Sequence, residues 1–367
     1  MPEREAAARK RGDLASEYFE QLCGRFEMAA DVVGGAGEQD LKIAGLRLRL
    51  RCAGESMRAA LLPPFEHLAT TAPGVPELTI SLFDTASTGI DAPPDVWPSP
   101  EAPPGTNPVV LLRSERASVL AAAGSGALTA VEPAAGEAIF HLPDAGRIPP
   151  SERAAPLRDA LQLLTAARGR SMTHAGAVGR GGRGVLVVGR GGSGKSTLAL
   201  ACALAEMEIV ADDYVLLETS QTPVAHAMQS TAKLTEDSAA RLGLSSEAIE
   251  AAGFESTLEG PAKALVDIRA VAPGAMVRQL EISAVIAPVL PPLTSDGRIE
   301  PSLRSISAAQ GLRAVAPSTI AQSSFQGASS LAALAALVRR VPSYELALSP
   351  DPAANAAAVA RLVGELG

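Results

Sequence analysis

The sequence predicts an α/β domain with a phosphate-binding loop over residues 146–367, preceded by an α+β domain over residues 1–145. Two observations favour this division. In the second half, a buried-strand run, a glycine-rich loop and a helix-forming segment follow one another between residues 184 and 204. In the first half, short apolar stretches separated by turn residues predict antiparallel strands. A chain of 367 residues also favours two domains over one.

The first domain is expected to open with a charged helix over residues 1–30, because apolar side chains recur there every fourth residue. Residues 41–52 then alternate between apolar residues and arginines, which predicts one half-buried strand. Its arginine face, formed by Arg47, Arg49 and Arg51, is either a binding surface or, as we favour, a solvated strand face. We expect the domain to serve substrate or partner recognition.

Further along the first domain, a helix is expected around residues 57–68 and a proline-rich surface loop over residues 92–108. His67 and His141 stand alone in the sequence and are expected to be structural. The remaining strands are expected at 77–84, 109–113, 117–122, 127–132 and 137–141.

Composition excludes several classes of protein. The net charge of −8 and the lack of a basic stripe argue against nucleic-acid binding. No apolar run is long enough to span a membrane, and no apolar run follows the charged N-terminus as in a signal peptide. The three cysteines have no zinc-ligand spacing, which predicts free thiols in the cytoplasm.

The phosphate-loop motif G-x-x-x-x-G-K-[ST] is complete between Gly189 and Ser196. A strand before it and a helix after it turn backbone N–H groups toward a phosphate. Lys195 is expected to reach the β- and γ-phosphates, and the Ser196 hydroxyl to bind Mg²⁺. The expected nucleotide-binding residues are Gly189, Gly191, Gly192, Ser193, Gly194, Lys195, Ser196 and Thr197.

An acid pair, Asp212 and Asp213, follows only 17 residues after Lys195, between two short strands. Two carboxylates at a strand end can divide two tasks, since one can bind Mg²⁺ while the other accepts a proton from a hydroxyl. A hairpin is expected directly before the phosphate loop, at residues 171–188, which is unusual for P-loop enzymes.

These features resemble the HPr serine kinase/phosphorylase family and its relatives. The resemblance rests on Thr173-His174-Ala175, on the phosphate loop and on Ala211-Asp212-Asp213, and less specifically on residues 230–234, 316–322 and 340–346. It implies an HPr-kinase-like P-loop kinase domain with a core of the phosphoenolpyruvate-carboxykinase type. The chain departs from the family in having Ala205-Glu206-Met207 where a glycine usually precedes the acid-pair strand.

Carried over to this chain, the resemblance implies that Ser196 and Asp212 hold Mg²⁺. Asp213 would act as the base, although the order of the two acids stays open. His174 would assist with the proton, or would be a core histidine. Ser230, Lys233 and Lys263 are candidate substrate or phosphate contacts, because lysine is rare in this arginine-rich chain and clusters near the loop.

The expected activity is therefore transfer of the γ-phosphate of ATP, with Mg²⁺, to a Ser or Thr hydroxyl of a peptide or protein. The glycine-rich segment that HPr kinases carry after the acid pair is not found, so HPr itself is not the expected acceptor. Two alternatives remain, a kinase for a small-molecule hydroxyl and a non-catalytic ATP-binding regulator. Analogy with the family leaves a homo-oligomer open.

Overall fold

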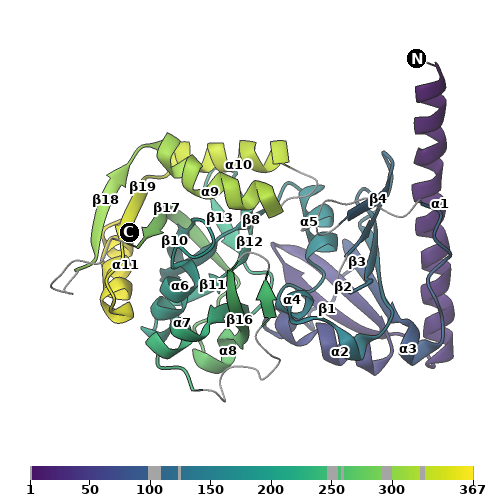
Figure 1. The fold of residues 1–367 in the computed structure, drawn as a ribbon, viewed down its shortest axis with the longest axis horizontal. Helices are drawn as coiled ribbons and strands as arrows, with labels where there is room; N and C mark the ends of the chain where they lie inside the picture. The colour runs from purple at the N-terminus through teal and green to yellow at the C-terminus, as the bar shows by residue number, and fades with distance from the viewer. Residues whose placement is uncertain are drawn as a thin grey trace. The chain divides into compact units, whose positions relative to one another are not determined.

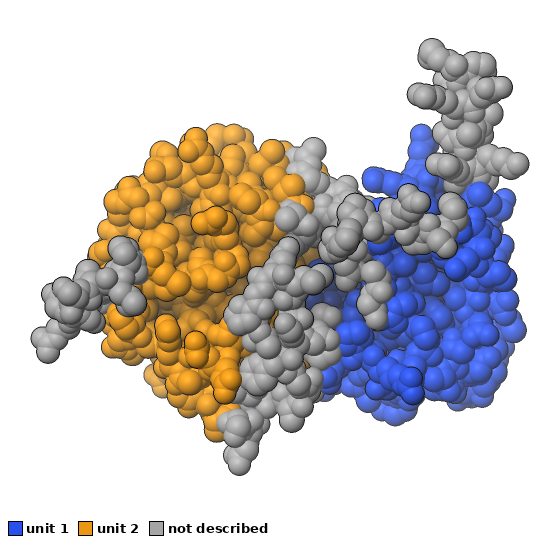
Figure 2. All heavy atoms as spheres, in the orientation of Figure 1, with its two compact units in different colours: residues 1–168 blue, residues 169–367 orange. Residues whose placement is uncertain are grey.

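A computed structural model describes residues 2–97, 109–122, 125–245, 255–257, 260–290, 300–322 and 327–366. The chain forms two compact units, residues 1–168 and 169–367, which Figure 2 colours separately. Both are mixed α/β structures. The division lies 23 residues later than the sequence predicted, because α5 (Arg158–Ala166) packs on strands of the first unit.

The first unit is built on one mixed sheet with the strand order β1-β2-β3-β7-β6-β5-β4. Its strands are β1 (Gly37–Ile43), β2 (Leu46–Ala53), β3 (Leu78–Asp84), β4 (Val109–Arg113), β5 (Ser118–Ala121), β6 (Leu128–Glu132) and β7 (Glu137–Leu142). The helical elements besides α5 are α1 (Pro2–Val32), α2 (Glu55–Leu61), η1 (Pro63–Leu68), α3 (Thr85–Thr88), η2 (Ala145–Arg147) and α4 (Pro150–Ala154).

Helix α1 is the predicted N-terminal helix, and it packs on the sheet of this unit (Figure 1). Tyr18, Leu22 and Phe26 are buried in one cluster with Phe83 of β3 and Ile139 of β7. The four-residue spacing that predicted the helix therefore also predicted its buried face.

The single strand expected over residues 41–52 is wrong, because the chain turns at Ala44 and Gly45, which both have positive φ. The result is the antiparallel β1–β2 hairpin. All three arginines on its outer face form ion pairs, Arg47 and Arg49 with Asp40 and Arg51 with Glu27. An ion-paired face agrees with a strand surface in water.

The second unit is built on a nine-stranded sheet and a separate three-stranded sheet. Its strands are β8 (Ser171–His174), β9 (Gly176–Arg180), β10 (Arg183–Val187), β11 (Glu208–Ala211), β12 (Tyr214–Glu218), β13 (Val224–His226), β14 (Thr231–Thr235), β15 (Glu255–Thr257), β16 (Gly260–Asp267), β17 (Gln279–Val289), β18 (Ser302–Ile306) and β19 (Ser343–Ala347). Its helices are α6 (Lys195–Leu204), α7 (Glu236–Arg241), α8 (Ile268–Val271), α9 (Ala308–Gln322), α10 (Gly327–Arg340) and α11 (Pro352–Leu366).

The large sheet runs β11-β9-β10-β17-β13-β12-β8, with β19 and β18 branching from β17. Strand β10, which leads to the phosphate loop, pairs antiparallel with β9 and parallel with β17. The predicted hairpin before the loop is therefore present. The predicted strand over residues 171–178 is instead two strands, because β8 pairs with β12 while β9 pairs with β10 and β11.

Helices α6 and α11 pack against each other and on β9, and their apolar side chains form the main core cluster of the unit with β10, β14 and β16. Helices α9 and α10 lie side by side and contact β8 (Figure 1). The small sheet, β14-β16-β15, contacts α6 through β14. The helix after the phosphate loop is thus held between the large sheet, α11 and the small sheet.

Helix α6 ends in a Schellman motif with a glutamate in the position that usually holds glycine. The N–H of Met207 donates to the Cys202 carbonyl and the N–H of Glu206 to the Ala203 carbonyl. Glu206 has φ of 60°, a left-handed conformation, and its side chain is exposed. The departure from the family noted in the sequence therefore falls at a position where the backbone favours glycine.

Replacing Glu206 by glycine is expected to raise the free energy of unfolding by about 0.5–1 kcal/mol, because it removes left-handed strain without removing a packed side chain. Urea unfolding of Glu206→Gly and of the wild type measures the change. As a control, Glu236→Gly in the first turn of α7 should instead destabilise the protein. A lower stability for Glu206→Gly would contradict this account of the helix end.

Candidate active site

The phosphate loop connects β10 to α6 and has the backbone conformation that its glycines permit. Gly189, Gly192 and Gly194 have positive φ values of 145°, 77° and 94°. A Cβ at Gly189 would lie 2.7 Å from the Ser193 hydroxyl, so a larger residue does not fit there. The loop is therefore shaped by glycine at three positions, as phosphate-cradling loops are.

Lys195 opens α6 and is only 6% exposed. Its ammonium donates to the Gly189 carbonyl at 2.8 Å and to the Arg190 carbonyl at 3.3 Å. Burial lowers the pKa of Lys195, while the nearby carboxylates of Asp213 and Asp212 oppose that shift. The ammonium thus lies against two carbonyls at the start of the loop.

Asp212 and Asp213 lie in the short connection between β11 and β12. Strand β8 pairs with β12 so that His174 lies opposite Tyr214, and this register brings His174 next to Asp213. Lys233 comes from β14, in the small sheet. The structure therefore brings together, from three strands, the acid pair, the predicted histidine and one of the predicted lysines.

Both oxygens of the Asp213 carboxylate have a basic neighbour. The Nε2 atom of His174 lies 2.9 Å from Oδ1, and the Nζ atom of Lys233 lies 2.9 Å from Oδ2. Burial acts to raise the pKa of Asp213, but the Lys233 ammonium and the hydrogen bond from His174 outweigh it and hold that pKa well below 3.8. Asp213 is therefore a carboxylate held ionised in a fixed orientation.

Asp212 has the opposite electrostatic environment. It is 1% exposed, and its Oδ2 atom accepts from the backbone N–H of Lys233 at 3.3 Å. Burial and then the adjacent charge of Asp213 raise its pKa to about 6, and a hydrogen bond with the Ser196 hydroxyl only partly offsets them. Its Oδ1 atom is buried and has no hydrogen-bond partner among the described residues. Among the described residues no ion pair like that between Asp213 and Lys233 is seen for Asp212, and the charge of Lys195 is the smallest of the effects that lower its pKa.

Three predicted contacts are less well placed. Lys263 of β16 lies near enough to Lys195 for its charge to help lower the Lys195 pKa, after burial. Ser230 is fully buried, and its hydroxyl lies beside the Asp267 carboxylate, so the structure does not bring it to the acid pair. The Thr197 hydroxyl bonds to Ser238 of α7 at 3.0 Å instead of facing the loop.

A magnesium ion fits the chemistry of the Ser196 and Asp212 oxygens. The Asp212 carboxylate has a buried oxygen without a partner and bonds to the Ser196 hydroxyl, and hard oxygen ligands are those that Mg²⁺ prefers. Within the described residues, no group of three or more His, Cys, Asp or Glu side chains forms a metal-binding cluster. A metal at this place would therefore share its coordination with phosphate oxygens and water.

Sequence reasoning missed Thr319 and Tyr214 as neighbours of His174. The Thr319 hydroxyl, from α9, accepts a hydrogen bond from the His174 backbone N–H at 3.2 Å. The Tyr214 ring lies 5.5 Å from the His174 ring, centroid to centroid. Tyr214 directly follows the acid pair and could have been noticed, whereas no local pattern connects Thr319 to a residue 145 positions away.

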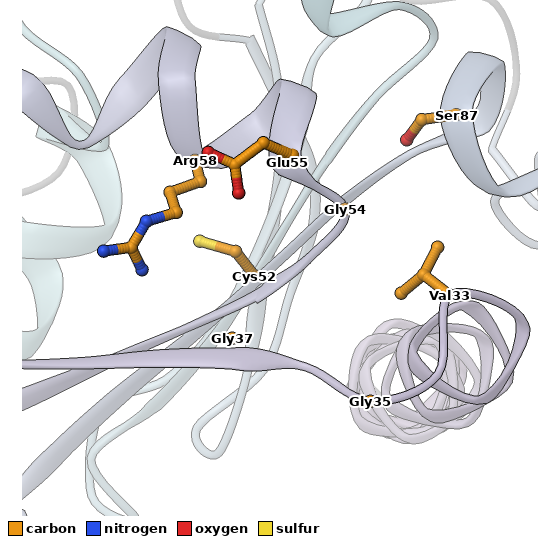
Figure 3. Close-up of a pocket in the computed structure, with 8 residues that line it drawn as sticks. All are labelled: Val33, Gly35, Gly37, Cys52, Gly54, Glu55, Arg58 and Ser87. Carbon is orange, nitrogen blue, oxygen red and sulfur yellow. The ribbon is translucent and has the colours of Figure 1, made fainter.

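A hollow of about 370 Å³ lies within the first unit, and Figure 3 shows the residues that line it. It is lined by Val33, Gly35, Gly37, Cys52, Gly54, Glu55, Arg58 and Ser87. Burial raises the pKa of the Cys52 thiol to about 12, so this cysteine is not a nucleophile at neutral pH. The hollow has none of the acid–base pairing found beside the phosphate loop.

No protein-family model and no curated protein matches the sequence. A solved structure, the Hpr(Ser) kinase/phosphatase from Coxiella burnetii, aligns at 17% identity over 53% of this chain and 99% of that chain, with a TM-score of 0.27. This score does not establish a common fold, so the site residues must support the function themselves. Among the described residues, no helix is long and apolar enough to cross a membrane.

The raised pKa of Asp212 predicts a pH-dependent stability. Because that pKa is about 6 in the folded protein and 3.8 in the reference state, the folded state binds this proton more tightly than the unfolded chain. The stabilisation is complete below pH 3.8 and is lost as pH rises through 6, with a total of about 3 kcal/mol. Asp212→Asn, which cannot ionise, should gain stability relative to the wild type over that range.

Urea unfolding without Mg²⁺, from about pH 4 to about pH 7.5, measures this difference. The exposed Asp237→Asn in α7 is the matched control, and its difference from the wild type should stay nearly constant with pH. A difference between Asp212→Asn and the wild type that is equally pH-independent would contradict a raised pKa at Asp212.

Proposed function

We propose that this chain is an ATP-dependent kinase that transfers the γ-phosphate to a Ser or Thr hydroxyl of a peptide or protein. The main support is one arrangement beside the phosphate loop. The ionised Asp213, held by His174 and Lys233, adjoins a second carboxylate, Asp212, that bonds to Ser196. A nucleotide-binding loop alone needs no such oriented carboxylate, whereas transfer to a hydroxyl does.

In this proposal the loop N–H groups and Lys195 bind the phosphates of ATP. The Lys195 ammonium would exchange the Gly189 and Arg190 carbonyls for phosphate oxygens when the nucleotide enters. The exchange replaces two neutral acceptors by anionic ones, so each hydrogen bond gains the Coulomb attraction of opposite charges. Binding therefore releases Lys195 from the loop and directs it to the β- and γ-phosphates.

Ser196 and Asp212 would hold Mg²⁺, with the Asp212 carboxylate ionised. Bound there, the ion would neutralise the charge that develops on the phosphate oxygens. Its positive charge would also oppose the raised pKa of Asp212, which results from burial beside Asp213 and is only partly offset by Ser196, the Lys233 backbone N–H and the charge of Lys195. The two acids then have separate tasks, as the sequence analysis proposed.

Asp213 is the proposed base. The acceptor hydroxyl gives its proton to the Asp213 carboxylate while its oxygen forms a bond to the γ-phosphorus. The bond between that phosphorus and the bridging oxygen of ATP breaks, and ADP leaves with the electron pair. His174 and Lys233 keep the carboxylate oriented before the proton arrives.

A peptide or protein acceptor is proposed on the resemblance of the sequence motifs, and a free metabolite with a hydroxyl is the alternative. The proposed location is the cytoplasm, which supplies ATP and keeps thiols reduced; Cys23, Cys52 and Cys202 are all free.

Lys195→Ala is expected to lower phosphate transfer by about 10²-fold or more, because it removes a charge that stabilises the transferring phosphoryl group. The assay follows label from [γ-³²P]ATP into a panel of peptides that contain Ser or Thr and a panel of metabolites that contain a free hydroxyl. Lys42→Ala is the control, since Lys42 is an exposed lysine on β1. Normal transfer by Lys195→Ala would overturn the proposal.

Two other results would select the alternatives. Label on a free metabolite, with none on any peptide, would make this a small-molecule kinase. Tight ATP binding by the wild type with no transfer to any acceptor would favour the non-catalytic regulator, which has no use for an oriented base.

Asp213→Asn is expected to reduce turnover by about 10²–10⁴-fold, since an amide cannot take the hydroxyl proton. ATP binding, measured by calorimetry, should change far less, because the loop contacts lie outside this carboxylate. Glu208→Gln at the start of β11 is a control for charge on the same stretch of chain. An equal loss of ATP binding and turnover in Asp213→Asn would place Asp213 in nucleotide binding instead.

A further inference from the structure

His174 ends β8, which lies at the edge of the large sheet among the described strands. Its backbone N–H donates to the Thr319 hydroxyl on α9 at 3.2 Å. Thr319 is 1% exposed, so this hydrogen bond is sheltered from water. A buried N–H group that loses its acceptor lowers the stability of the folded protein. The end of β8 is therefore tied to a helix that comes about 145 residues later in the chain.

The His174 ring is not placed to meet a substrate. Its Nε2 atom is engaged by Asp213 at 2.9 Å, and its Nδ1 atom is buried with no hydrogen-bond partner in the described part of the chain. Nε2 is the donor in this contact, because the ionised Asp213 carboxylate can only accept. His174 thus acts through Asp213 and not on the acceptor.

The Tyr214 ring, 5.5 Å away between centroids, packs beside the His174 ring, and Tyr214 is only 4% exposed. The ring of His174 is therefore fixed on three sides: by Tyr214, by the Asp213 carboxylate and, through its own backbone, by Thr319. Of these three contacts, Thr319 alone comes from outside the strands that carry the acid pair and the histidine.

Helix α9 contains Pro317, two residues before Thr319. Proline has no N–H to donate, so one hydrogen bond of the helix is missing in this turn. The position of the turn depends correspondingly more on its tertiary contacts, and the bond to His174 is one of them. The contact therefore fixes the position of α9 and of the end of β8 relative to each other.

We propose that Thr319 is a positioning residue for the His174–Asp213 pair and that α9 belongs to the catalytic unit. The functional part of this proposal rests on the kinase activity proposed above. Without the hydroxyl, the end of β8 loses its anchor, the His174 ring shifts, and Asp213 is oriented by Lys233 alone. The carboxylate then points less accurately at the acceptor, while the phosphate loop is unaffected.

The structural part is tested by NMR of histidine in the full chain, which has only four histidines. The protein is labelled with ¹⁵N-histidine, and the His174 signals are assigned by their loss in His174→Gln. Thr319→Val should shift the His174 imidazole signals and speed exchange of its Nε2 proton about five- to tenfold. Thr319→Ser, which keeps the acceptor, should restore both.

Thr165→Val in α5 is the matched control. Like Thr319, Thr165 is a buried threonine in a helix with a hydrogen bond to the backbone. Its hydroxyl donates to the Leu161 carbonyl at 2.6 Å. The same chemical change there should leave the His174 signals unchanged. Unchanged His174 signals in Thr319→Val, or signals that Thr319→Ser fails to restore, would overturn the proposed anchor.

The functional part is tested with the labelled-ATP assay. Thr319→Val should lower kcat about tenfold, leave the KM for ATP unchanged, and be rescued by Thr319→Ser. Wild-type turnover in Thr319→Val would overturn the positioning role. A wild-type protein that transfers no phosphate would overturn the kinase proposal instead, and the NMR measurement would still decide whether Thr319 anchors His174.

Discussion

The candidate site depends on the burial of two adjacent carboxylates. Moving a charge out of water is costly unless a partner compensates it, and two like charges side by side increase that cost. Here the compensation is unequal. Lys233 forms an ion pair with Asp213 and His174 orients it, whereas Asp212 has hydrogen bonds from Ser196 and a backbone N–H and, as the smallest contribution, the charge of Lys195. The inequality gives the two acids different chemistry at the same strand end.

Lys233, the cation beside Asp213, comes from the small sheet β14-β16-β15. The sequence did not predict these three strands as one sheet. Strand β14 buries Ala232 and Leu234 in the core cluster with α6, and the alternation of a strand therefore directs Lys233 to the other face. The position of the lysine is thus a consequence of core packing. A sheet that packs on the helix of the phosphate loop also supplies the charge that holds the neighbouring carboxylate.

Much of this could be predicted from the sequence because the information is local. A glycine loop between a strand and a helix, and an acid pair 17 residues after Lys195, are patterns within one short stretch. The contact of Thr319 with His174 could not be predicted, since nothing local specifies which helix covers a strand end. The turn at Ala44 and Gly45 was missed, although the apolar residues change there from odd positions (Leu41, Ile43) to even positions (Leu46, Leu48). The boundary between the two units was predicted after residue 145 but follows residue 168, because α5 packs on β6 and β7 of the first unit.

The Schellman end of α6 has a mechanical consequence. Helix α6 has ten residues, and its closing turn leads to β11 within a few residues. The phosphate loop and the acid pair are therefore separated along the chain only by this helix, its closing turn and β11. On the proposed function, a shift of the loop when a nucleotide binds would therefore reach both acids through α6 and β11. Two other elements reach this part of the molecule, since the small sheet contacts α6 through β14 and Thr319 of α9 bonds to His174, the neighbour of Asp213.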